Sequence, residues 1–419
     1  MAHLVMFLYT AFYIGRIHEL FAVLRPLRIV LVLGLLGIVL TLALPPRKRN
    51  RLLRLPEVRI VLGLFAVAVV FAPFGVWPGG SLSYIIDTYS RVILFFFLIV
   101  MLATSRRVIQ HLVWSVLTGV AFLGLFTTFW GASLTTAYGG RAYASTTYDP
   151  NDVAMIMVCT LPLAAFAAIA LRGVRRVAAA AIAVICVLTI IMTMSRGGFI
   201  GLVTVSLLLL FRLGKASLAP RIVILITVGT FLVGVAPAKY WDLMATIWRP
   251  STGGAYAEAG VLPRVELWRR GVNLFAGAPL TGVGIGAFEV AEGLSHAGLG
   301  AWVAAHNSYI QLGAELGVVG FALFTALLAI SIRNARRVVR AARRDVRLRP
   351  LTWIARAVET SLYAYLVEGF ALSQAYSPML YFLIATAAAL RLQVERAALA
   401  PPRVEAAPLL VRSREVVRA

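Results

Sequence analysis

Apolar runs of membrane-spanning length alternate with short polar or basic loops along most of this chain. A helix needs about 20 mostly apolar residues to cross a bilayer. Twelve runs approach that length: 4–23, 28–45, 59–77, 91–104, 109–130, 153–171, 177–194, 198–211, 222–237, 308–332, 353–371 and 376–390. The pattern predicts an all-α, polytopic integral membrane protein with about twelve transmembrane helices in a single domain over 1–419. Two short runs, 91–104 and 198–211, are expected to extend into their flanks.

The alternation is interrupted once, between the ninth and tenth runs. Residues 238–307 are too polar and too rich in glycine to lie in lipid, so they predict one long extramembrane loop. Within it, RVELWRRGVNLF has the apolar spacing of a short helix lying on the membrane surface. The glycines of PLTGVGIGAFE lack the strand–turn–helix context of a dinucleotide site, so they favour a tightly packed loop.

Composition and charge support the membrane assignment and exclude nucleic acid as a partner. The chain is 61% hydrophobic and 14% charged, whereas soluble domains are about 25% charged. The net charge of +23 comes from loops such as 47–59 and 333–349, which alternate with loops poor in lysine. This is the positive-inside pattern, which predicts cytoplasmic basic loops, two cytoplasmic termini and a flexible tail over 393–419. Contact with anionic membrane lipids is a further expectation.

The first run is the least regular, because it carries Arg16, His18 and Glu19. If it only lies at the interface, the N-terminus is on the opposite side and the remaining topology is unchanged. The N-terminus also lacks the basic stretch and cleavage site of a signal peptide. Cys159 and Cys186 fall inside apolar runs, which predicts core or lipid-facing thiols and no disulfide framework.

Isolated arginines in the lysine-poor loops break the charge rule, which makes them candidates for function. A guanidinium can bind a pair of phosphate oxygens, although an arginine at a helix end can also simply reach lipid headgroups. Headgroup contact is favoured for Arg269 and Arg270. Arg196 lies in the turn SRGG, whose glycines allow close approach, so function is favoured there. The five exceptions are Arg141, Arg196, Arg264, Arg269 and Arg270.

Other candidates have structural explanations beside the functional one. Asp149 and Asn151 precede an apolar run, where they can cap the helix that starts at about residue 152. Glu266 is expected to be ion-paired or solvated. His306 and Asn307 begin a span at the loop side, where polar groups are often functional. No second histidine or cysteine stands at metal-ligand spacing, so no metal site is predicted.

These segments together resemble a known family. RVELW…PLTGVGIGAFE followed by AHNSYIQLGAELGVVGF resembles the signature region of the O-antigen ligase and polymerase superfamily, and GRAYASTTYDPNDVA and MSRGGFIGL match upstream elements in the same order. The resemblance implies a GT-C-like glycosyltransferase of the bacterial inner membrane with its active site facing the periplasm. It would transfer a glycan from undecaprenyl diphosphate to a lipid A–core sugar or a lipid-linked glycan, with inversion and without a metal or cofactor.

The same resemblance, joined to the charge argument, suggests a role for each candidate. Arg196 and Arg264 would stabilise the departing diphosphate, and His306 would activate the attacking hydroxyl. Residues expected to bind or orient the substrates are Arg141, Asp149, Asn151, Arg270 and Asn307.

Three alternatives remain open at this stage. A polymerase would join lipid-linked repeat units to one another, and a protein O-glycosylating ligase would use a polypeptide acceptor. A transporter of lipid-linked glycans would have two related halves with broken helices, and no such internal repeat is evident in the sequence.

Overall fold

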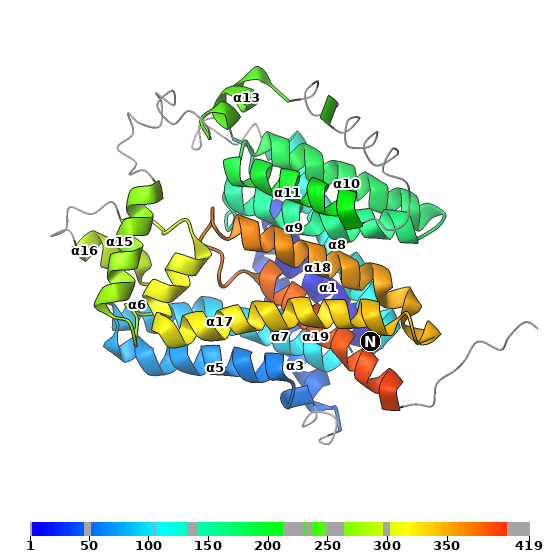
Figure 1. The fold of residues 1–419 in the computed structure, drawn as a ribbon, viewed down its shortest axis with the longest axis horizontal. Coiled ribbons are helices and arrows are strands. Elements are labelled where there is room, and N and C mark those ends of the chain that lie inside the picture. The colour runs from blue at the N-terminus through cyan, green and yellow to red at the C-terminus, as the bar shows by residue number, and fades with distance from the viewer. Residues whose placement is uncertain are drawn as a thin grey trace, which may run out of the picture.

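The computed structural model describes residues 2–45, 52–103, 105–131, 141–212, 229–230, 234, 236–247, 264–295 and 302–399. The regular secondary structure of these residues is entirely helical, with no β-strand among them (Figure 1). The all-α prediction is therefore confirmed. The ninth predicted run, 222–237, and the tail 400–419 lie largely or wholly outside the described residues.

The longer elements follow the predicted runs. They are α1 (Ala2–Gly15), α3 (Ile29–Leu42), α5 (Pro56–Phe71), α7 (Ser90–Leu102), α8 (Arg106–Phe129), α9 (Pro150–Ala170), α10 (Val174–Met192), α11 (Arg196–Arg212), α17 (Ser308–Ala341), α18 (Thr352–Glu368) and α19 (Pro378–Leu399). Shorter helices are α2 (Ile17–Leu20), α6 (Pro78–Tyr84), α13 (Ala238–Ala245), α15 (Arg264–Gly277) and α16 (Phe288–Ser295).

Seven helical stretches within the described residues are long and apolar enough to cross a membrane. They are Ala22–Leu42, Pro56–Phe74, Pro78–Leu102, Arg106–Phe129, Pro150–Ala170, Val174–Met192 and Ser308–Ala341. Ala2–Gly15 and Arg196–Phe211 are apolar but shorter. These segments support a membrane protein, and the count of twelve crossings stays a prediction.

The predicted continuous helix over 4–23 is wrong. α1 ends at Gly15, and Arg16 adopts a left-handed backbone with a φ of 50°. The Arg16 guanidinium lies over the rings of Tyr13 and Tyr148, at 5.4 and 5.2 Å from their centroids. The chain therefore turns where a charged side chain finds aromatic partners within the protein.

Glu19, just beyond this break, contacts the segment that leads into α9. Its carboxylate accepts hydrogen bonds from the Thr147 hydroxyl at 2.7 Å and from the Thr146 hydroxyl and the Thr147 N–H, each at 3.1 Å. The polar residues that made the first run irregular thus connect it to the chain that precedes α9.

Three further boundaries differ from expectation. Residues 78–89, which lie between two predicted runs and were expected to be a loop, are helical. They join the short run 91–104 to form the 25-residue stretch Pro78–Leu102, so the expected extension of that run is confirmed. α17 continues to Ala341, so part of the basic loop is helix. α19 continues to Leu399, which means that residues 393–399 are not part of a flexible tail.

α9 lies at the centre of the bundle, where it packs against α10, α11 and α18. Of its most apolar 18 residues, 78% are buried. Helices approach one another closely where glycines replace larger side chains. A Cβ atom on Gly119 of α8 would lie only 2.5 Å from the Ala11 carbonyl oxygen of α1. Both cysteines, Cys159 on α9 and Cys186 on α10, are buried and unpaired, as predicted.

The glycine-rich segment of the long loop packs against a break in α17. Gly282, Gly284 and Gly286 all have positive φ. The N–H groups of Val283 and Gly284 donate to the carbonyl oxygens of Ala314 and Glu315, at 2.8 and 3.1 Å. Gly317 is itself non-helical with a φ of 64°, and the following N–H, of Val318, donates to the Pro279 carbonyl at 2.8 Å. The expected tightly packed loop is confirmed.

Candidate functional site

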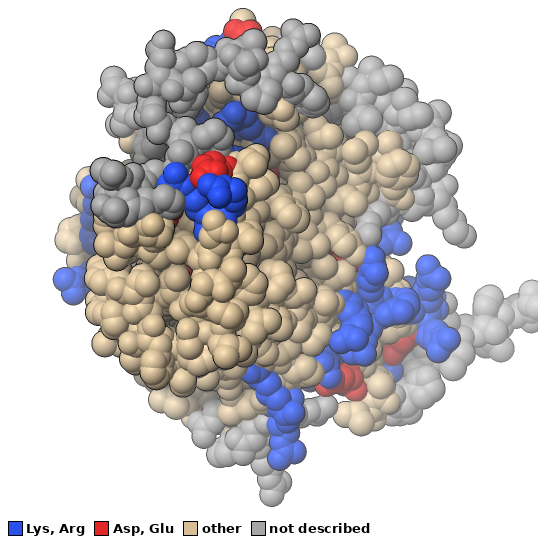
Figure 2. All heavy atoms as spheres, turned by 60° about the vertical axis from the view of Figure 1, so that its left-hand side comes forward, with Lys and Arg blue, Asp and Glu red and all other residues tan. Residues whose placement is uncertain are grey.

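The candidate residues gather at one end of the bundle. α9, α11, α15 and α17 begin there and α18 ends there, with α15 and α16 at the left of Figure 1. Most of the surface in Figure 2 is tan, and Lys and Arg are confined to separate groups. The end formed by these helix termini is called the site end below.

Arg264, Arg196 and Arg141 share one electrostatic environment at the site end. The pKa of Arg264 is lowered to about 10, first because burial disfavours its charge and then because Arg196 and Arg141 repel it. Asp149 and Glu368 oppose this shift. Arg264 still carries its charge at neutral pH. The three guanidiniums therefore create a concentrated positive potential in a half-buried setting, which suits a dianionic ligand.

Arg141 is held by the turn between α10 and α11. Its Nε donates to the Thr193 carbonyl oxygen at 3.0 Å, and its Nη2 donates to Asn151 Oδ1 at 2.6 Å. The same Asn151 oxygen accepts from the Ser195 hydroxyl at 3.0 Å. Ser195 Oγ in turn accepts from the Gly198 N–H at 3.2 Å, near the start of α11. Asn151 thus links the start of α9 to the turn that carries Arg196.

Asp149 caps α9, as its sequence position indicated, with the helix starting at Pro150. Its Oδ1 accepts from the N–H groups of Asn151 and Asp152, at 2.7 and 2.8 Å. Asp152 Oδ2 accepts from the Asp149 N–H at 3.2 Å, which completes a capping box. A capping role does not remove Asp149 from the site, because its charge also acts on Arg264 and His306.

Arg196 is the first residue of α11 and reaches α13, where its Nη1 donates to Thr246 Oγ1 at 3.2 Å. The adjoining glycines allow neighbouring helices to approach. A Cβ atom on Gly198 would lie 2.7 Å from the Ala154 Cβ of α9. The SRGG turn therefore fixes where the Arg196 backbone lies between α9, α13 and α18.

His306 directly precedes the N-cap of α17 and is half-buried, with a left-handed φ of 47°. Its pKa is lowered from 6.5, first by burial and then by the Arg264 charge, while Asp149 opposes the shift. The imidazole is therefore neutral at neutral pH and can accept a proton. A left-handed backbone at a residue other than glycine costs about 1 kcal/mol or more, and such strain often occurs at functional sites.

Asn307 is the N-cap of α17, where its Oδ1 accepts from the N–H groups of Tyr309 and Ile310 at 3.0 and 3.1 Å. Ser308 fixes the same helix start against the end of α18. Its N–H donates to the Gly369 carbonyl at 2.7 Å, and its hydroxyl donates to the Leu372 carbonyl at 2.6 Å. The α17 start that carries His306 is thus rigidly joined to α18.

Glu368, the last residue of α18, belongs to the same cluster and was missed by the sequence interpretation. The residue is 1% exposed, and neither carboxylate oxygen has a hydrogen-bond partner in the described part of the chain. Gly197 and Gly201 of α11 make room for it, since a Cβ atom on Gly201 would collide with Glu368 Oε1. The available signal was a carboxylate in the second half of the apolar run 353–371, where membrane energetics favour a functional role for such a group.

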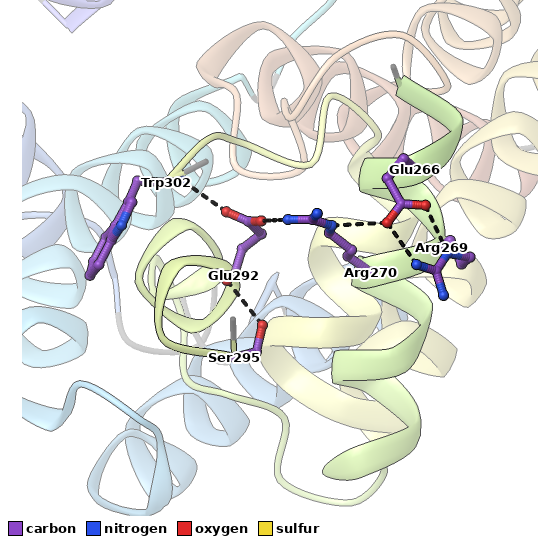
Figure 3. A network of polar contacts seen from close by, with 6 residues as sticks. All are labelled: Glu266, Arg269, Arg270, Glu292, Ser295 and Trp302. Atoms are coloured by element: carbon purple, nitrogen blue, oxygen red, sulfur yellow. Dashed lines mark hydrogen bonds and ion pairs between the residues drawn. The ribbon is translucent and has the colours of Figure 1, made fainter. Parts of the chain in front are cut away.

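Arg270 lies six residues beyond Arg264 and has other partners. It donates to Glu266 at 3.0 Å and to the buried Glu292 at 2.5 Å, while Arg269 donates to Glu266 at 2.7 and 2.8 Å (Figure 3). Glu266 is therefore ion-paired, as expected, and these hydrogen bonds lower its pKa to about 2. Arg270 fastens α15 to α16.

The network of Figure 3 also reaches the segment that leads to His306. Glu292 Oε2 accepts from the Trp302 N–H at 2.8 Å, so one carboxylate connects Arg270 to the chain four residues before His306. In the described residues, no group of three or more His, Cys, Asp or Glu side chains is arranged to hold a metal ion. The positive charge that the described residues place at the site end comes from Arg141, Arg196 and Arg264.

Comparison with known families gives one match: residues 181–325 match the family model described as O-antigen ligase. Over these residues, which include MSRGGFIGL and the signature region, the match confirms the resemblance found in the sequence, and GRAYASTTYDPNDVA lies outside them. The matched region contains Arg196, Arg264 and His306 and ends inside α17, so Arg141, Asp149 and Glu368 lie outside it. No curated protein matches the chain at a significant level.

Proposed function

From the match to the O-antigen ligase family, we propose that this chain transfers a glycan from a polyprenyl diphosphate, undecaprenyl diphosphate in bacteria, to a sugar hydroxyl of lipid A–core. The single observation that carries the proposal is the cluster of Arg141, Arg196 and Arg264 beside a neutral His306. A diphosphate leaving group needs positive charge, and an attacking hydroxyl needs a proton acceptor. The cluster offers both within one half-buried site.

In this mechanism His306 accepts the proton of the acceptor hydroxyl while its oxygen bonds to the anomeric carbon of the donor. The bond from that carbon to the diphosphate oxygen breaks, and its electron pair leaves with the diphosphate. Arg264 and Arg196 stabilise the charge that grows there, which is usually the largest catalytic contribution. Attack opposite the leaving group inverts the anomeric configuration. Arg141, fixed by Asn151, would hold the diphosphate or the first sugar.

Asp149, Glu368, Asn307 and Arg270 have supporting roles in this proposal. Asp149 and Glu368, when ionised, raise the pKa of Arg264 and so oppose the effect of its burial. Asn307 fixes the helix start next to His306, and Arg270 fixes α15. The site end would face the periplasm and the basic loops the cytoplasm of a bacterial inner membrane, with both termini cytoplasmic and 238–307 as the periplasmic loop.

An apolar groove beside the site suits the hydrocarbon chain of the donor. It lies between α15 and α17, has a volume of about 240 Å³ and is lined almost wholly by apolar atoms. Tyr309, three residues after His306, forms part of its wall, so a lipid whose diphosphate is at the arginines can lie along it. Its other principal lining residues are Gly271, Phe275, Ile310, Gly313 and Phe321.

Filling the groove should weaken use of the lipid donor. A Cβ atom on Gly313 would have its nearest neighbours at 3.8 Å, in the rings of Phe275 and Phe321, so Gly313→Leu would enter the groove without a backbone clash. We expect KM for the long-chain donor to rise at least tenfold and that for a short-chain donor to change little. Gly79→Leu, at a position with no neighbour within 4 Å, is the matched control. Equal effects on both donors would contradict the assignment.

The activity itself is tested by reconstitution in liposomes with a lipid-linked glycan, with and without lipid A–core. Product that depends on lipid A–core, and its loss in His306→Ala, is the expected result, with Arg269→Ala as a folded control that retains activity. Longer lipid-linked glycan formed without lipid A–core would identify a polymerase instead. Absence of both products from folded wild-type protein would contradict the proposal and favour a protein acceptor or transport.

A further inference from the structure

A second cavity lies at the far end of α17 from His306. It has a volume of about 580 Å³ and is formed by the end of α17, the turn after it and the facing part of α19. Four of its arginines, called the rim arginines, are Arg337, Arg340, Arg343 and Arg344. Arg391 and Glu395 of α19 complete its charged lining.

The α19 side of the cavity is neutralised and held in place. Arg391 donates to Glu395 at 2.8 Å and lies 3.7 Å from the carboxylate of Glu57, a fully buried residue of α5. Asn334 of α17 donates to the other oxygen of Glu57. Three helices therefore meet around one buried carboxylate, and Arg391 is already occupied by acidic partners.

The rim arginines differ from nearby arginines in their pairing with acidic side chains. Arg336 pairs with Glu359 at 2.6 Å and Arg347 pairs with Asp345 at 2.7 Å, so acidic partners are present at this end of the molecule. None of the rim arginines has an acidic partner in the part of the chain that the structure describes, and all four are exposed. Four like charges around one cavity repel one another unless an anion is bound between them.

We propose that this cavity binds the phosphate headgroup of an anionic phospholipid. Guanidiniums bind phosphate oxygens in pairs, which provides the charge complementarity. Ala341 and Val394 add apolar surface to the lining, as contact with the glycerol and first methylenes of a lipid requires. Basic pockets between transmembrane helices commonly hold such headgroups. The proposal does not depend on the chemistry proposed for the site end.

The bound headgroup would lie between the rim arginines and the facing apolar side chain of Val394 on α19. α17 and α19 both begin beside the site end and finish at this cavity, and their apolar faces pack together along the way. An anion between the rim arginines would remove their mutual repulsion. Anionic lipid should therefore raise the melting temperature of the purified protein, because a ligand that binds only the folded state stabilises it.

The test is native mass spectrometry of the full chain with phosphatidylglycerol and, as the zwitterionic probe, phosphatidylcholine with the same acyl chains. The rim variant Arg340→Ala/Arg343→Ala/Arg344→Ala should lose at least tenfold in affinity for phosphatidylglycerol. The matched control Arg172→Ala/Arg175→Ala/Arg176→Ala removes three exposed arginines that do not line the cavity, and it should bind as wild type does. An equal loss in both variants, or equal binding of both lipids, would overturn the proposal.

Two further arms exclude a soluble ligand and a folding defect. Glycerophosphoglycerol, the headgroup without acyl chains, and inorganic phosphate should bind at least tenfold more weakly than the lipid; affinity equal to that of the lipid would assign the cavity to a soluble anion and overturn the lipid assignment. The charge-preserving variant Arg340→Lys/Arg343→Lys/Arg344→Lys should keep most of the affinity. Loss of binding in this folded variant would contradict an electrostatic site.

Discussion

At the residue scale, the important features of the site end are ionisable side chains that are partly or wholly buried. His306 and Arg264 both have lowered pKa values because burial disfavours their charged forms and because positive charges lie nearby. Glu368 is buried beside them without a hydrogen-bond partner in the described residues. The sequence supplied the arginines and the histidine as candidates, because each breaks a rule of membrane topology. It could not supply their mutual distances.

The pH dependence of glycan transfer should follow the protonation of the His306 imidazole. Because its neutral form accepts the proton and its pKa lies below 6.5, the rate should be level near neutrality and fall only at more acidic pH. Asp149 raises the pKa of His306, so Asp149→Asn should move this acidic limb to still lower pH. Asparagine retains the helix cap, which limits structural effects. The measurement is kcat/KM against pH, and a limb above 6.5 or a shift upward would contradict the assignment.

Glu368→Gln should separate binding from turnover. The substitution keeps the shape but replaces an acidic group with one that cannot ionise, so attraction for the donor diphosphate is retained or increased. We expect kcat to fall at least tenfold while KM does not rise, because the acidic group that raises the pKa of Arg264 is lost. Glu289→Gln, at an exposed position of α16, is the control. A kcat equal to wild type would remove Glu368 from the site.

At the element scale, helices and their approximate ends followed from hydropathy, while breaks in helices did not. The turn at Arg16 depends on Tyr13 and Tyr148, the second being far away in the sequence. The kink at Gly317 depends on backbone hydrogen bonds from the loop at 279–284. A glycine at or next to each break indicated that the backbone there could depart from helical geometry. The contacts that require this departure, however, were set by packing.

Gly317→Ala should destabilise the protein markedly. A φ of 64° disfavours any residue with a Cβ atom by about 1–2 kcal/mol, and the added carbon would also collide with the Leu280 carbonyl oxygen. Gly313→Ala, one turn earlier with no neighbour nearer than 3.8 Å, should be neutral or stabilising. Thermal unfolding in detergent compares the two. Equal melting temperatures would mean that the kink is not fixed by the loop.

At the scale of the whole molecule, the site and the rim arginines lie at opposite ends of α17. The basic loops predict which end faces the cytoplasm, and the proposed function requires the site end to be outside. The charge rule and the proposed function therefore predict the same orientation of the protein in the membrane, which one experiment can check.

Single cysteines should report this orientation in intact cells. A membrane-impermeant maleimide should label Arg269→Cys at the site end and should label Arg175→Cys only after the membrane is opened. The native Cys159 and Cys186 are buried, so the background should be low. Labelling in the reverse order would contradict both the topology and the periplasmic site.

The sequence alone determined the helical class and most helix positions, and it supplied the arginines and histidine of the candidate site, since hydropathy and the charge rule act locally. Only the tertiary structure decided which helices are central. Ala22–Leu42 and Pro150–Ala170 have mean hydropathies of 2.3 and 2.4 over their most apolar 18 residues. Of those residues, 11% are buried in the first segment and 78% in the second. The physical reason is that lipid tails and a protein core are equally apolar. For the same reason, only the packed bundle revealed that Glu368 is close enough to Arg264 to affect its pKa.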